Sequence, residues 1–75
     1  MTISEFNALS YEGKMKATKQ AGYIATMEDD THTIILYQLE SFYIEVFFHR
    51  HHHFISDFRG IEDINILKPF LQMSS

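Results

Sequence analysis

The chain has no cysteine among its 75 residues. Disulfide bridges and zinc sites built on thiolates are therefore excluded, which leaves self-association or a histidine-held metal to supplement so small a core. No apolar run approaches the roughly 20 residues of a membrane span. The N-terminal residues Met-Thr-Ile-Ser-Glu-Phe also lack the basic and apolar regions of a signal peptide. We therefore expect a cytoplasmic protein that does not associate with a membrane.

Basic residues are scarce, with six Lys and Arg against ten Asp and Glu, and the net charge is −4 with neutral histidines. Tyr43 and Phe47 are expected on the same face of one strand, where they could stack unpaired bases. The sequence lacks the basic groove that accompanies such aromatic residues in nucleic-acid-binding proteins. We do not expect a nucleic-acid partner.

Features of a catalytic site are also missing from the sequence. There is no glycine-rich phosphate loop and no cysteine nucleophile, and nothing places a histidine beside Ser41. We expect a protein that is not an enzyme and that needs no cofactor.

Apolar residues are plentiful, at 45% of the chain, and aromatic residues make up 15%. The N-terminal residues 3–21 carry apolar side chains at helical spacing, with Thr2 or Ser4 as the first N-cap and Ser10 as a second. Gly13 costs about 1 kcal/mol in a helix interior. The pattern therefore predicts either one kinked helix or two short helices.

Four strands are predicted after the helical region, at residues 23–28, 32–39, 42–49 and 54–59. Gly22 is suited to the position just after a helix, Gly60 is expected to end the last strand, and Lys68-Pro69 is expected to begin a short C-terminal helix. The connections are too short for parallel crossovers. The predicted fold class is a single α+β domain with an antiparallel meander and helices on one face.

The two strands between Thr33 and Phe48 flank a short break at Glu40-Ser41, which is typical of a β-hairpin. If Leu39 lies opposite Phe42, one face is almost wholly apolar and suits the N-terminal helix; its residues are Thr33, Ile35, Tyr37, Leu39, Phe42, Ile44, Val46 and Phe48. The second face is mixed, and its residues are His32, Ile34, Leu36, Gln38, Tyr43, Glu45, Phe47 and His49.

The second face needs a cover, and three occupants fit the sequence. The first is the C-terminal segment, through Ile64, Leu67, Phe70 and Leu71. The second is another copy of the chain or a small protein partner, because aromatic side chains amid polar groups are typical of interfaces. The third is a small ligand held between the sheet and a helix. The leading hypothesis is a self-associating interaction or regulatory module, with an interface at Ile34, Leu36, Tyr43, Glu45 and Phe47.

The segment His49-Arg50-His51-His52-His53 is the one local motif that indicates chemistry. Neutral imidazoles on one strand face can bind Zn²⁺, Ni²⁺ or Cu²⁺. A divalent metal site would use His32, His49, His51 and His53, with Glu45 as a carboxylate ligand. The alternatives are a solvated turn and a pH-sensitive interface, because protonation of all five histidines near pH 6.5 would carry the net charge from −4 towards +1. If its face is buried, Glu45 needs a partner such as His32, His49 or Lys68.

The string Ile35-Leu36-Tyr37-Gln38-Leu39-x-x-Phe42-Tyr43-Ile44-Glu45-Val46 resembles a group of small uncharacterised proteins from Bacteroidetes-type bacteria. Flanking segments share the resemblance, namely Phe6-Asn7-x-Leu9-Ser10 and Lys68-Pro69-Phe70-Leu71. The resemblance implies a free-standing cytoplasmic α+β protein with no established activity, and it transfers no site residues.

Overall fold

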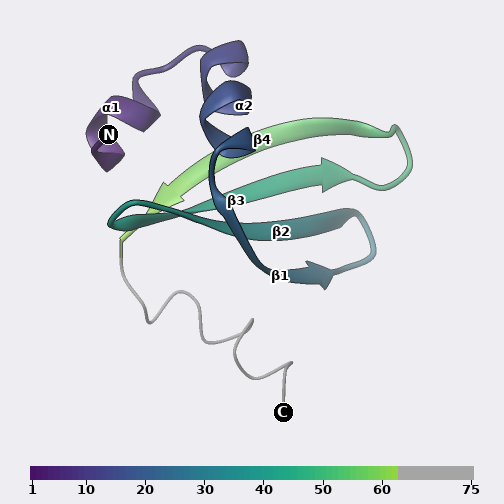
Figure 1. Ribbon diagram of the computed structural model, residues 1–75. Coiled ribbons are helices and arrows are strands. Elements are labelled where there is room, and N and C mark those ends of the chain that lie inside the picture. Colours follow the sequence, from purple (N-terminus) through teal and green to yellow (C-terminus); the bar gives the residue numbers. More distant parts are fainter. Residues whose placement is uncertain (63–75) are drawn as a thin grey trace.

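The computed structural model describes residues 1–62 of the chain. Two short helices lie on one face of a four-stranded antiparallel sheet whose strands follow the sequence order (Figure 1). The elements are α1 (Ile3–Asn7), α2 (Tyr11–Lys19), β1 (Gly22–Glu28), β2 (His32–Leu39), β3 (Phe42–His49) and β4 (Phe54–Ile61). The α+β class and the meander are confirmed, and the helix predicted at Lys68-Pro69 lies outside the described residues.

Two capping side chains divide the N-terminal region into separate helices. Thr2 caps α1 in a capping box, because its Oγ1 accepts from the Glu5 amide at 3.2 Å and its own amide donates to the Glu5 carboxylate at 2.8 Å. Ser10 Oγ accepts from the Gly13 amide at 3.2 Å and starts α2. The prediction for Gly22 is wrong: Gln20 is the C-cap of α2, and Gly22 is already the first residue of β1.

The central hairpin has the predicted register, from Leu39 opposite Phe42 to His32 opposite His49. Its two-residue turn places Glu40 at φ 55°, a left-handed conformation that few non-glycine residues adopt. The Glu40 carboxylate accepts from the N-terminal ammonium at 2.6 Å, which ties the start of the chain to this turn.

The Asp29 turn between β1 and β2 is held by side-chain hydrogen bonds. Asp29 Oδ1 accepts from the amides of His32, at 2.6 Å, and Thr31, at 2.8 Å. These bonds, the His32 bond first, hold the pKa of the exposed Asp29 carboxyl below its usual value.

Strand β4 is longer than predicted, and Gly60 lies inside it rather than at its end. A Cβ at Gly60 would lie 3.0 Å from Ile3 Cγ1 and 3.1 Å from Asn7 Oδ1, so the missing side chain lets α1 approach the sheet. The register between β3 and β4 shifts between Phe47 and Phe48. As a result, Ile55 packs on the helix-facing side, whereas regular strand alternation would place it on the face of Asp57 and Arg59.

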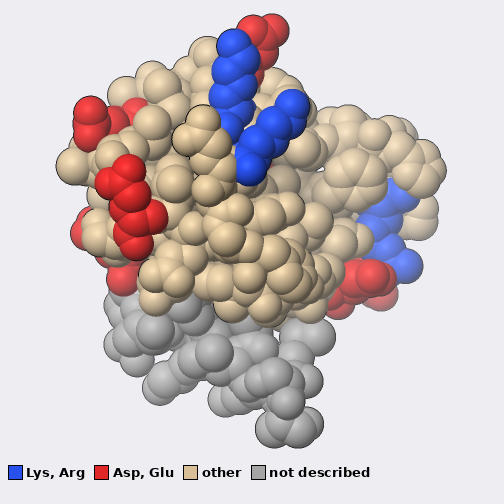
Figure 2. Space-filling view, in the orientation of Figure 1, with Lys and Arg blue, Asp and Glu red and all other residues tan. Residues whose placement is uncertain are grey.

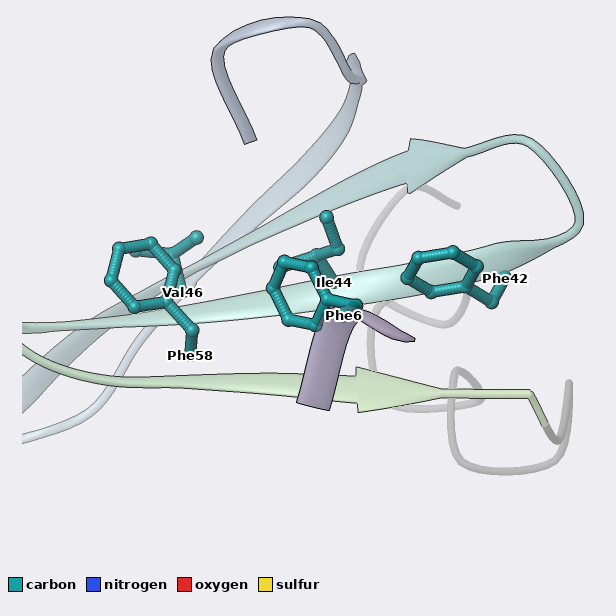
Figure 3. Packing of buried hydrophobic residues seen from close by; sticks show 5 residues of the cluster. All are labelled: Phe6, Phe42, Ile44, Val46 and Phe58. Carbon is teal, nitrogen blue, oxygen red and sulfur yellow. The ribbon is translucent and has the colours of Figure 1, made fainter. Parts of the chain in front are cut away.

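The main core lies between the helices and the sheet, on the face predicted to receive them. Its buried residues are Phe6, Phe42, Ile44, Val46 and Phe58. Phe6 is the one member from a helix; it lies beside Ile44 over β3, with Phe42 on one side and Val46 and Phe58 on the other (Figure 3). Aromatic edges extend this packing, since the Tyr11 ring meets the Phe58 ring at 5.4 Å.

Candidate functional site

The second sheet face carries all five residues predicted to form an interface. Ile34 and Leu36 are buried and form a second cluster with Ile61. Tyr43 and Phe47 pack at the margin of that cluster and remain half-exposed. The residues proposed to cover this face from the C-terminal segment, namely Ile64, Leu67, Phe70 and Leu71, lie outside the described residues.

Glu45 lies in the middle of this face, opposite Leu36 on β2 and Arg59 on β4. Its side chain is only 9% exposed, and no group within residues 1–62 donates a hydrogen bond to its Oε1. Among the described residues, the nearest cation is Arg59, whose Nη1 lies 3.9 Å from Oε1, too far for a hydrogen bond. Burying a carboxylate oxygen without a hydrogen-bond donor costs free energy, so Oε1 of Glu45 needs an explanation.

Burial raises the pKa of the Glu45 carboxyl, and the Arg59 guanidinium offsets part of that rise. The sequence suggested His32, His49 or Lys68 as the partner of Glu45, and Arg59 was missed. Counting residue pairs along β3 and β4 from their connecting turn places Arg59 opposite Glu45 only if the register shift between Phe47 and Phe48 is included. That shift leaves no clear pattern in the sequence.

The raised pKa makes a prediction about stability and pH. Because the folded carboxyl binds a proton more readily than the unfolded one, the free energy of unfolding falls as the pH rises from the ordinary value of 4.5 through the folded value. We expect Glu45→Gln to raise the free energy of unfolding at pH 7 by about 1 kcal/mol. The gain should shrink as the pH falls below the ordinary value, as urea titrations at several pH values will measure.

The matched control is Glu28→Gln, an exposed carboxylate 3.6 Å from Arg50 in the same sheet. It should change the free energy of unfolding by less than about 0.5 kcal/mol. A gain for Glu45→Gln that is the same at pH 4 and pH 7 would contradict an ionised, unsatisfied Glu45.

The histidines gather at the end of the sheet where the β1–β2 and β3–β4 connections lie together (Figure 1). The His49 ring is at the centre: its centroid lies 4.4 Å from His52, 5.4 Å from His32 and 6.1 Å from His51. The Phe54 ring stacks on His49 at 5.6 Å, with 5° between the planes. The hairpin register predicted that His32 and His49 lie side by side, and the turn brings His52 against His49 as well.

His53 lies apart from this group. Its backbone has φ 55° in the turn, and its ring lies 6.4 Å from Phe48, which belongs to the helix-facing side. Strand alternation therefore stops at His49 and does not place His53 beside it. In the part of the chain that the structure describes, no three His, Asp or Glu side chains are arranged to hold a metal ion.

The electrostatics of the cluster favour a neutral imidazole at His49. Desolvation, followed by the neighbouring His52, His32 and His51, holds the His49 pKa below its usual value. The His52 amide donates to His49 Nδ1 at 3.2 Å, which leaves the ring proton on Nε2. A neutral ring of this kind can stack or ligate a metal after rearrangement, but it carries no charge near neutral pH.

The chain matches no protein-family model, and no curated protein or solved structure is similar to it. The resemblance to small Bacteroidetes-type proteins therefore stays a prediction. Neither of the described helices is long and apolar enough to cross a lipid bilayer.

Proposed function

We propose that this protein is a small non-enzymatic interaction module that self-associates through the second face of its sheet. The observation that carries the proposal is the buried Glu45 carboxylate, whose Oε1 has no donor among residues 1–62. A second copy of the chain can bring a positive charge beside this carboxylate, because Arg59 flanks Glu45 and its side chain is 58% exposed.

A two-fold axis near Glu45 would place Arg59 of each copy against Glu45 of the other. Such an interface is self-complementary, so each copy brings a positive charge beside the other's Glu45 in the same way. Tyr43 and Phe47 flank Glu45 along β3 and would supply aromatic contact area around the charged pairs. Ile34 and Leu36, already buried, would form the floor beneath this contact.

Two of the described serines use their hydroxyl groups within the fold. Ser56 donates to the Phe47 carbonyl at 3.1 Å, and Ser10 caps α2. Neither hydroxyl contacts a histidine, which a serine nucleophile needs for activation.

The decisive experiment is sedimentation of the wild type and of Arg59→Glu between 1 and 500 μM, on the order of the concentrations that separate weak dimers from monomers. We expect a dimer for the wild type. In Arg59→Glu a carboxylate faces the buried Glu45 of the other copy, so the dissociation constant should rise about 30-fold or more. Tyr43→Glu should weaken the dimer in the same direction.

Arg50→Glu is the matched control, because it makes the same charge change on an exposed side chain that pairs with Glu28 away from Glu45. It should leave the dissociation constant within about threefold of the wild type. A monomeric wild type at the highest concentration, or equal effects of Arg59→Glu and Arg50→Glu, would refute the proposal.

A metal- or small-ligand-binding role at the histidine end is the second candidate, and the observation in its favour is the packing of three imidazoles around His49. Rotation of His32, His51 and His52 would be needed to gather the ring nitrogens on one ion. Calorimetric titration with Zn²⁺ and Ni²⁺ separates the candidates. Binding weaker than about 100 μM, or no loss in His49→Ala, removes the metal role.

A further inference from the structure

A hollow of about 390 Å³ lies on the helix-facing side of the sheet, opposite the face proposed for self-association. It exists because α2 covers only part of this side. Ten residues line it: Met15, Thr18, Lys19, Ala21, Ile35, Tyr37, Val46, Phe48, Ile55 and Phe58. Its volume falls within the range of about 300–1,000 Å³ that is typical of small-molecule sites.

The lining of this hollow is apolar apart from Thr18, Lys19 and Tyr37. Strands β2, β3 and β4 supply an aliphatic and aromatic floor, which includes Ile35, Phe48 and Ile55. Lys19 is the one charged residue of the lining, and no acidic side chain belongs to it. In a chain of net charge −4, the hollow is therefore locally positive. Figure 2 shows basic side chains beside acidic side-chain atoms near the top of the view, above a broad area without charged side chains.

Polar groups other than the Lys19 ammonium also bear on whether an anion can bind in this hollow. Thr18 Oγ1 already donates to the Lys14 carbonyl at 2.7 Å, so it does not need a ligand. Two carbonyls in the last turn of α2, those of Ala17 and Thr18, accept from the Gln20 and Ala21 amides at 3.1 and 3.0 Å, so they are already engaged. Tyr37 presents a hydroxyl in the same lining that forms no hydrogen bond with a described residue, and it can donate one.

We propose that this hollow binds an amphipathic carboxylate, with a single alkyl or aryl body on the sheet and the carboxylate at Lys19 and Tyr37. The apolar floor accounts for the body of the ligand, and the single positive charge on the lining accounts for its anionic end. A neutral or cationic amphiphile of the same length loses the second interaction. This site lies on the other face from Glu45, so the proposal stands or falls independently of self-association.

The test is calorimetric titration of the whole chain with decanoate, hexanoate and decyltrimethylammonium. A ligand with about 12 non-hydrogen atoms and ordinary efficiency should bind near 0.1 mM, and we expect decanoate to do so. Removing methylenes should cost at least tenfold between decanoate and hexanoate. Decyltrimethylammonium should bind at least fivefold more weakly than decanoate.

Lys19→Gln and Lys16→Gln are the matched pair of variants. Both remove one exposed positive charge from α2, but Lys16 borders a different hollow, beside Leu9 and Glu40. Lys19→Gln should weaken decanoate binding about fivefold, and Lys16→Gln by less than twofold. Absence of binding below 1 mM, equal affinity for the cationic amphiphile, or equal effects of the two substitutions would overturn the proposal.

Discussion

Phe6→Ala is expected to lower the free energy of unfolding by about 3–5 kcal/mol, which is a large share of the stability of a domain this small. Phe6 is fully buried, and its ring lies 5.7 Å from that of Phe42. It projects from α1, which has only five residues and cannot be stable by itself. Loss of the ring therefore removes both core volume and the anchor that holds α1 to the sheet.

Urea unfolding followed by circular dichroism measures this loss, with Phe54→Ala as the control. Phe54 has the same side chain but is 49% exposed on β4, and its truncation should cost less than about 1 kcal/mol. A Phe6–Phe42 double-mutant cycle should return a coupling of about 0.5–1.5 kcal/mol from the ring contact. Equal losses for Phe6→Ala and Phe54→Ala would show that α1 does not pack as described.

Leu36→Ala should lower the free energy of unfolding by about 2–5 kcal/mol, although Leu36 lies on the opposite side of the sheet from the helices. The side chain is fully buried beside Ile34 and Ile61. The loss should appear even at protein concentrations at which the chain is monomeric, because this burial exists within one copy.

The control for Leu36→Ala is Ile24→Ala, on β1. Ile24 lies at the register shift between Tyr23 and Ala25 and is 38% exposed, so its truncation should cost less than about 1 kcal/mol. Unfolding measured at about 2 and about 200 μM protein separates the contribution of the second face to folding from its contribution to dimerisation. A dimer adds stability only at concentrations at which it is populated. A Leu36→Ala loss that vanishes at the lower concentration would contradict a second core within the single copy.

Both faces of the sheet therefore carry buried side chains that stabilise the fold. The surface available for binding is limited to the parts of each face that these side chains do not occupy. On the second face, Ile34, Leu36 and Glu45 are buried within one copy, whereas Arg59, Tyr43 and Phe47 keep atoms available for a partner. On the helix-facing side, the part that α2 leaves open is available for a ligand.

Much of the fold was predictable because its signals are local. Period-two alternation placed β2 and β3 at their observed residues, and the two-residue break at Glu40-Ser41 fixed their register. Thr2 and Ser10 cap their own helices within a few residues, so the division into α1 and α2 was one of the two alternatives that the sequence predicted.

The errors arose where distant segments meet. The sequence predicted that Gly60 ends the strand, but it lies within β4, where its missing side chain lets α1 approach closely. Arg59 was not recognised as the neighbour of Glu45, since a one-residue shift in the β3–β4 register decides which face each β4 residue occupies. His53 was expected beside His49, but the left-handed turn directs it to the other side.

The sequence by itself determined the α+β class, the meander, the central hairpin and the apolar side that receives the helices, because these depend on periodicity and capping over short distances. Only the tertiary structure decided that Glu45 is buried beside Arg59, that His52 joins His49, and that α2 leaves a hollow lined by Lys19. Each of these depends on a register shift, a turn conformation or the reach of a short helix. Such features change which side chains meet without changing the hydrophobic pattern.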